Sequence, residues 1–115
     1  MVRVKINREE STNLHIQVAA EIRRAIAEGE AAPGDRLPPA KDLAAELGVN
    51  TNTVLRALRL LREEGLLDFK RGRGVHVSGS PEHGALVDRA HELLEFARHH
   101  GYRRQDLLDI IESLP

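Results

Sequence analysis

Polar and cationic side chains recur at helical spacing in the middle of the sequence. Asn52, Arg56 and Arg59 are three or four residues apart, which places them on one side of a helix. Asn50 and Thr51 stand directly before this run. Asparagine can bond adenine through two hydrogen bonds, and arginine can bond guanine or a phosphate. The pattern predicts a helix that fits a DNA major groove. The alternative is that Asn50 and Thr51 only cap the helix and that the arginines are ordinary solvated residues.

A second cationic group follows in the segment Arg71-Gly72-Arg73-Gly74. Leu67 and Phe69 before it, and Val75 and Val77 after it, alternate with polar residues, which is the period of two short strands. The glycines supply the unusual backbone angles of a tight turn. We expect a hairpin over residues 66–77 whose arginines rest on phosphates or enter the minor groove. A nucleotide-binding loop is not indicated, because the third glycine and the helix that should follow it are missing.

Two helices are expected directly before this hairpin. The first begins near Pro39 and ends at Gly48, a residue that accepts left-handed backbone angles. The second runs from about Thr51 to Glu64, with Asn50 as its N-cap and Gly65 as its stop. The inward positions of the two helices are apolar: Leu43, Ala44, Leu47, Val54, Ala57, Leu58 and Leu61. The order of helix, three-residue turn, helix and hairpin is that of a winged helix-turn-helix.

Further elements precede this motif. Leu14, Val18, Ile22 and Ile26 recur every four residues and predict a helix near residues 12–28. Val2, Val4 and Ile6 alternate with cationic residues and predict a short strand or extended arm. Prolines and a glycine mark a loop between residues 30 and 39.

The C-terminal part of the sequence predicts a linker over residues 79–84 and two amphipathic helices over residues 85–115. Two helices of this length cannot bury both apolar faces well by themselves, so we expect them to form a dimer. The candidate dimerisation residues are Leu86, Leu93, Leu94, Ala97, Leu107, Leu108 and Ile111. The alternative is that these helices fold back on the first helix within one chain.

The length and composition limit the number of domains, the cellular compartment and the kind of partner that we expect. The chain has 115 residues, which suits one compact domain with a small appendage and leaves no room for a separate catalytic domain. It contains 0 cysteines, no signal-peptide pattern and no long apolar run, so we expect a soluble cytoplasmic protein without a membrane partner. The net charge of -1 hides a gradient, because residues 50–74 carry six cationic against three acidic side chains, and residues 81–115 four against seven. The basic middle is the part suited to a polyanion.

Metal binding and catalysis are not indicated. His91, Glu95 and His99 stand at i, i+4 and i+8 of one predicted helix. Residues eight apart are about 12 Å apart along a helix and cannot share one ion, so solvent-facing histidines are the better interpretation. No nucleophile and base are paired in a recognisable pattern. We therefore expect no metal, no cofactor and no enzymatic activity.

Several spaced segments resemble the GntR family of bacterial transcription regulators, and in particular its small YtrA-like branch. The segments are PGDRLP, KDLAAELGVN, NTVLRAL, LREEGLL and RGRGVHV, within residues 4–77. The resemblance implies a winged helix, a double-stranded DNA partner and, in larger members, a metabolite effector bound by a C-terminal domain. Lys41 stands where the family usually has arginine, and lysine lacks the bidentate fork, so phosphate contact is favoured there over base readout.

Together these observations predict an α+β fold that is mostly α: an N-terminal winged helix-turn-helix domain over residues 1–78, the linker, and a two-helix dimerisation region. The predicted function is that of a sequence-specific regulator, a homodimeric repressor on a palindromic operator, with a small-molecule effector possible. The alternative is a winged-helix module that binds protein rather than DNA. The predicted DNA-binding residues are Arg36, Lys41, Asn50, Thr51, Asn52, Thr53, Arg56, Arg59, Arg71, Gly72 and Arg73.

Overall fold

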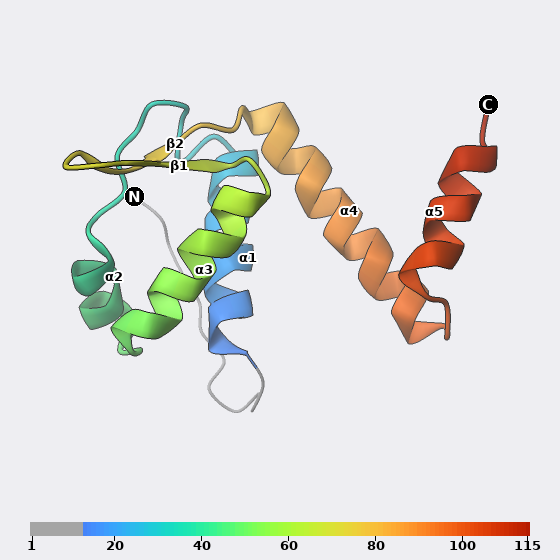
Figure 1. Cartoon of the computed structure of the whole chain (residues 1–115), viewed down its shortest axis with the longest axis horizontal. Helices are drawn as coiled ribbons and strands as arrows, with labels where there is room; N and C mark the ends of the chain where they lie inside the picture. Colours follow the sequence, from blue (N-terminus) through green and yellow to red (C-terminus); the bar gives the residue numbers. More distant parts are fainter. Residues whose placement is uncertain (1–12) are drawn as a thin grey trace.

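A computed structural model describes residues 13–115 of the chain (Figure 1). The elements follow in the order α1 (Leu14–Ala27), α2 (Ala40–Leu47), α3 (Thr51–Glu63), β1 (Leu67–Lys70), β2 (Gly74–Val77), α4 (Pro81–His99) and α5 (Arg104–Ser113). This order confirms the predicted fold class, and the ends of α1, α2 and α3 lie within one or two residues of those expected from the caps and glycines. The predicted arm over residues 2–6 lies outside the described residues. Within residues 13–115, no helix combines the length and the apolar character that crossing a lipid bilayer requires.

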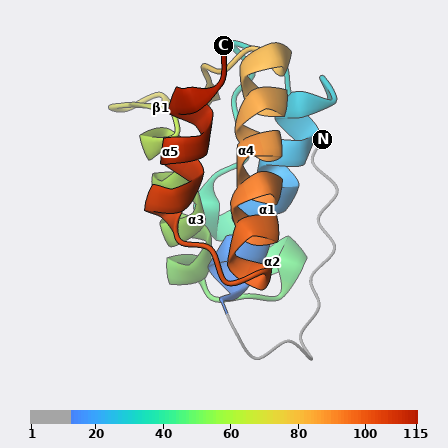
Figure 2. The same cartoon turned by 90° about the vertical axis from the view of Figure 1, so that its right-hand side faces the viewer.

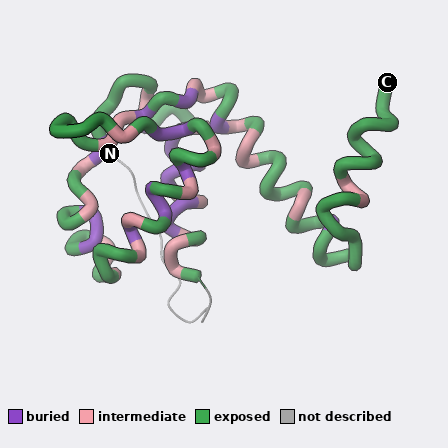
Figure 3. Tube along the Cα trace, viewed as in Figure 1, coloured by how far each residue is buried: buried purple, intermediate pink, exposed green. Residues whose placement is uncertain are grey.

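The core lies where α1, α2, α3 and the two strands meet. Val18, Ile22 and Ile26 of α1 pack against Leu58 and Leu61 of α3, and all are almost fully buried. These residues recur at helical spacing, which is why one face of each helix is buried and the other stays polar. Figure 3 shows the buried residues gathered in this part of the molecule, whereas most of α4 and α5 is exposed.

The hairpin of β1 and β2 forms the wing of the fold. The strands are antiparallel and pair Leu67 with Val77 and Phe69 with Val75, as the alternation of apolar residues predicted. Gly72 has a φ of 74° and Gly74 a φ of 83°, backbone angles that favour glycine over residues with a side chain. On the outer side of the core, the guanidinium of Arg62 lies 4.5 Å from the centre of the Phe69 ring, so α3 and β1 are joined by a cation–π contact.

Helix α4 begins earlier than the sequence indicated. The predicted linker over residues 79–84 is wrong over its last four positions, because α4 starts at Pro81. The Ser80 side chain accepts a hydrogen bond from the His83 N–H at 3.0 Å, so a serine caps the helix and proline occupies its first position. Gly84 is buried against α1, and a Cβ there would lie 2.9 Å from Ile26 Cγ2. Gly84, which the sequence analysis placed in the linker, thus permits close packing between α1 and α4.

The terminal helices project from the winged-helix domain. Figure 1 shows α4 leaving the domain on the side away from the wing tip, and Figure 2 shows α5 turning back beside α4. The first half of α4 packs against α1, so the fold-back alternative holds for that half, while α5 contacts α4 rather than the core. At the start of α5, the Arg103 N–H donates to Asp106 at 2.7 Å. This backbone hydrogen bond, followed by the Arg103 guanidinium, lowers the pKa of the Asp106 carboxyl.

Candidate nucleic-acid interface

Helix α3 presents the polar side that its sequence predicted. Asn52, Arg56 and Arg59 are exposed, and Thr53 is half-buried. The opposite side of α3 is held against the core by its buried apolar residues, so the helix cannot rotate these polar groups inward without exposing that apolar surface. The exposed row therefore has a fixed direction before any ligand arrives.

Asn50 has a structural role that is now defined. Its side-chain Oδ1 accepts a hydrogen bond from the Asn52 N–H at 2.8 Å, which caps the first turn of α3. Asn50 therefore caps the helix, as the alternative interpretation of the sequence proposed. Thr51 is exposed at the first position of the helix, where the positive end of the helix dipole lies. Such a helix start favours an anionic group such as a phosphate.

Helix α2 contributes one exposed cation. Lys41 is exposed in the first turn of α2, and the turn of residues 48–50 brings the end of α2 next to the start of α3. Pro39 stands at the N-cap of α2, and no side-chain hydrogen bond caps that end. A serine at this position would supply a capping oxygen, and without one the helix is less stable by about 1 kcal/mol.

The tip of the wing carries two more cations. Arg71, Gly72 and Arg73 are all exposed, and the turn is closed by a 2.8 Å hydrogen bond from the Arg73 N–H to the Lys70 carbonyl. Arg36, in the loop before α2, lies against the base of this turn. A Cβ on Gly74 would lie 2.8 Å from Arg36 Nε, and the backbone of Arg36 forms a bridge with that of His76. Arg36 thus supports the wing as well as adding charge beside it.

Two functional features were not found from the sequence. The first is His15 of α1, which lies close enough to Arg56 for the two charges to interact. Burial, and then the charge of Arg56, lower the pKa of His15 below its ordinary value of 6.5. His15 was missed because its neighbour lies on another helix, forty-one residues away in the sequence.

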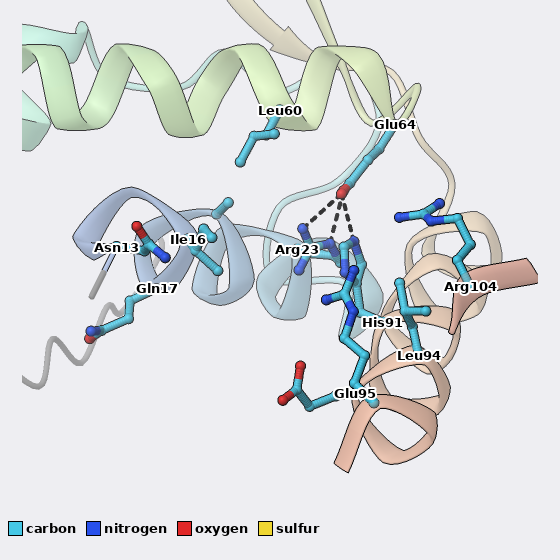
Figure 4. A pocket seen from close by; sticks show the side chains of 12 residues that line it. Asn13, Ile16, Gln17, Arg23, Leu60, Glu64, His91, Leu94, Glu95 and Arg104 are labelled. Atoms are coloured by element: carbon cyan, nitrogen blue, oxygen red, sulfur yellow. Dashed lines mark hydrogen bonds and ion pairs between the residues drawn. The ribbon is translucent and has the colours of Figure 1, made fainter. Parts of the chain in front are cut away.

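The second is a charged junction between α1, α3 and α4, shown in Figure 4. Arg23, only 5% exposed, binds the Glu64 carboxylate with two nitrogens at 2.9 Å each, and His91 Nε2 lies 2.6 Å from Glu64 Oε2. An ionised carboxylate only accepts, so His91 donates through Nε2–H. His91 is exposed, as the sequence predicted, and it also has a partner in Glu64. The junction borders a cleft of 710 Å³ lined also by Ile16, Leu60, Leu94 and Arg104.

The candidate dimerisation residues divide into two groups. Leu86, Leu93, Leu108 and Ile111 are exposed apolar side chains, with Leu86 at 68%. Ala97 is buried, and Leu94 and Leu107 are half-buried, so these three already pack within the chain. The exposed group is joined by residues that the sequence analysis did not select: Phe96, Ile110 and Leu114.

A protein-family model matches the chain over the winged helix. The model described as "Bacterial regulatory proteins, gntR family" matches residues 14–77, the stretch from α1 to the end of the wing.

Individual relatives agree with this match. The chain is 33% identical to the HTH-type transcriptional repressor YtrA of Bacillus subtilis, over 65% of this chain and 58% of that protein. It is 31% identical to the Exu regulon transcriptional regulator of Escherichia coli, over 90% of this chain and 40% of that protein. The chain thus spans between two fifths and three fifths of the length of these curated relatives.

Solved structures are similar in the same region. YtrA from Sulfolobus acidocaldarius, a GntR-family transcription factor, superposes with a TM-score of 0.63 at 35% identity, covering 80% of this chain and 97% of that one. The AraR DNA-binding domain in complex with operator ORR3 superposes with a TM-score of 0.54 at 31% identity, covering 56% of this chain and 77% of that one.

Proposed function

The chain belongs to the gntR family of bacterial regulatory proteins, as a YtrA-like transcription regulator with a DNA-binding helix-turn-helix, and on that premise we propose that it is a cytoplasmic homodimeric repressor of a palindromic operator. In this proposal α3 lies in the major groove and the wing contacts the flanking backbone or minor groove. The named family and its relatives are regulators rather than enzymes. The proposal adds the oligomeric state, the symmetry of the operator and the direction of regulation.

The observation that carries the proposal is the fixed, exposed row of Asn52, Arg56 and Arg59 on α3. In the chain α3 follows α2, which carries Lys41, and leads into the hairpin that carries the wing arginines, so we place all three elements on one DNA segment. Amide and guanidinium groups are those that read base edges, whereas lysine and wing arginines suit phosphates. We assign base readout to α3 and phosphate contact to Lys41, Arg36, Arg71 and Arg73. Asn50, Thr51, Thr53 and Gly72 are assigned to shaping the surface and to backbone contacts.

The proposed homodimer rests on the exposed apolar side chains of α4 and α5. An isolated chain would leave Leu86, Leu93, Leu108 and Ile111 in water, at a cost of about 25 cal/mol for each Å² of apolar surface. A second copy that presents the same side chains would cover them in a two-fold symmetric contact. Because each recognition helix reads only a few base pairs, two copies on a symmetric site raise both affinity and specificity.

The repressor role is proposed by analogy with the B. subtilis protein, which is named a repressor. The cleft bordered by the Arg23–Glu64–His91 junction is our candidate site for a small-molecule effector. Its volume of 710 Å³ lies in the range of ligand pockets, and its walls combine apolar Leu60 and Leu94 with cationic Arg104.

Selection of bound sequences from a random DNA pool tests the proposal directly. We expect the selected sequences to share an inverted repeat with half-site centres about 10 bp apart or a multiple of that. Affinity for the selected duplex should fall steeply with salt, by about one unit of log–log slope for each phosphate contact. A pool that yielded no enriched sequence, with weak binding that did not respond to salt, would favour the protein-binding module instead.

A further inference from the structure

Helix α4 is held against the winged-helix domain along one side, by Gly84 and Val87 in its first half and by His83 and His91, which both contact Glu64. Gly84, in its first turn, packs against Ile26 at the end of α1. His91, two turns further along, donates to Glu64 at the end of α3. Gly84, Val87, His91 and Leu94 are spaced by three and four residues, so they lie on the same side of the helix. From His91 onward this side borders the 710 Å³ cleft instead of a packed surface. The His91 contact therefore stands where close packing gives way to open space.

Glu64 is a well-fixed partner for His91. It is the C-cap of α3, and its carboxylate is held by both nitrogens that the Arg23 guanidinium directs at it. Its backbone carbonyl accepts a further hydrogen bond from His83 Nε2 at 3.0 Å. A bidentate arginine fixes the plane of a carboxylate as well as its position. One residue thus joins α1, α3 and α4, and Figure 4 shows the dashed contacts meeting on its carboxylate.

A displacement of α4 at His91 becomes larger toward the C-terminal end of the helix. With a rise of about 1.5 Å per residue, His91 lies about 10 Å from Gly84 along the helix axis, and His99 about 22 Å. If α4 pivots at Gly84, a displacement of about 1 Å at His91 becomes about 2 Å at His99. Two-fold symmetry would apply the same change to the partner chain. The exposed residues Leu93, Phe96 and Leu108 all lie beyond His91 in the chain, on the part of the molecule that would move.

We propose that His91 is a positioning residue that sets the half-site spacing of the operator. Acting through Glu64, it fixes the angle between α3 and the helices that join the two copies. That angle determines how far apart the two α3 helices lie on DNA. The inference rests on the proposed homodimer. It adds a role for His91 and a preferred half-site spacing, neither of which dimerisation alone specifies.

The test compares four full-length proteins: wild type, His91→Leu, His91→Gln and His99→Leu. The glutamine keeps a side-chain N–H for Glu64, while leucine has none. His99→Leu is the matched control, because His91 and His99 are both exposed on α4 but the His99 ring contacts His100 rather than Glu64. The probes are the pool-selected duplex, the same duplex with one base pair inserted or removed between half-sites, and a single half-site. Affinities are measured by anisotropy, and the dimer is checked by sedimentation velocity.

Wild type should prefer the selected spacing over the altered ones, and His91→Leu should reduce that preference by about threefold or more. Its affinity for the single half-site should stay within about twofold of wild type, because α3 itself is unchanged. His91→Gln and His99→Leu should keep the wild-type preference. A dimeric His91→Leu protein with the wild-type preference would overturn the inference alone. A wild type that is monomeric, or that binds no paired duplex, would overturn the proposed homodimer and the inference with it.

Discussion

At the scale of single residues, the side chains around α3 fall into two groups. Some hold the surface in shape, and others are exposed and available to contact DNA. Asn50 uses its oxygen to cap the helix, and Arg36 lies against Gly74 at the base of the wing. Arg56 and Arg59 are exposed on the outward face of α3. Different substitutions should therefore have different consequences: some should weaken binding to every sequence, and others should alter which sequence is preferred.

Lys41 is expected to contact phosphate. Lys41→Ala should weaken binding to selected and unrelated duplexes by similar factors, and should lower the salt slope by about one unit. Anisotropy titrations at several salt concentrations measure both quantities. If Lys41→Ala instead changed the preferred sequence and left the slope unaltered, lysine would be reading a base.

His15 should make stability depend on pH. Its pKa is lowered in the folded state, by burial first and by Arg56 second, so the unfolded chain binds the proton more tightly. Protonation therefore favours unfolding, and the free energy of unfolding should fall as the pH drops below about 6.5 and through the lowered pKa. His15→Gln should remove this part of the decrease. Urea unfolding of both proteins at about pH 7.5 and about pH 5 measures it, and an identical decrease in both would contradict the assignment.

At the scale of elements, most of the fold followed from the sequence because its determinants are local. The cap at Asn50, the stop at Gly48 and the alternation around Phe69 each act within a few residues, and the helices and wing lie where these features predicted. Features set by contacts between distant segments were missed. Gly84 looked like a linker glycine because its neighbour Ile26 is remote in sequence, and the Arg23–Glu64–His91 junction joins three helices.

The wing offers a test of such a distant contact. Gly72 and Gly74 both have positive φ, so alanine strains the backbone at either position, at about 1 kcal/mol. Only at Gly74 would the added Cβ also meet a neighbour, at 2.8 Å from Arg36 Nε, whereas nothing lies within 4 Å at Gly72. Because that neighbour is the end of an exposed, flexible side chain that can swing aside, Gly74→Ala and Gly72→Ala should lower stability by similar amounts. Thermal unfolding and anisotropy of the two variants provide the comparison. A clearly larger loss of stability for Gly74→Ala would show that the Arg36 side chain is held rigidly against the wing.

At the scale of the whole molecule, the surfaces proposed to meet DNA and a second copy lie at opposite ends. The wing projects away from α4 and α5 (Figure 1), so both surfaces can be occupied together. The charge gradient along the sequence has the same direction, with the basic segment in the DNA-binding part and the acidic segment in α4 and α5. An acidic terminal region would be repelled by DNA, which helps to orient the molecule on it.

Dimerisation through α5 predicts a difference between two similar isoleucines. Ile111 on α5 and Ile16 on α1 are each 49% exposed. Ile111→Asp would place a charge in the proposed interface and should yield monomers, whereas Ile16→Asp, beside the cleft, should leave the dimer intact. Sedimentation velocity distinguishes the two states. A dimeric Ile111→Asp protein would show that the copies associate elsewhere.

The most direct test of the account is the affinity of Arg56→Ala for the pool-selected duplex, measured by fluorescence anisotropy beside Arg89→Ala. Both arginines are exposed, but Arg56 lies on the outward row of α3 and Arg89 lies on α4, where it pairs with Glu92 at 3.4 Å. Loss of a base or phosphate contact should cost Arg56→Ala about 1 to 3 kcal/mol of binding free energy in each half-site. Arg89→Ala, which leaves α3 unaltered, should bind as wild type does once sedimentation velocity has shown that it is dimeric. Unchanged affinity for Arg56→Ala, in a protein that still folds and dimerises, would contradict the claim that α3 reads the operator.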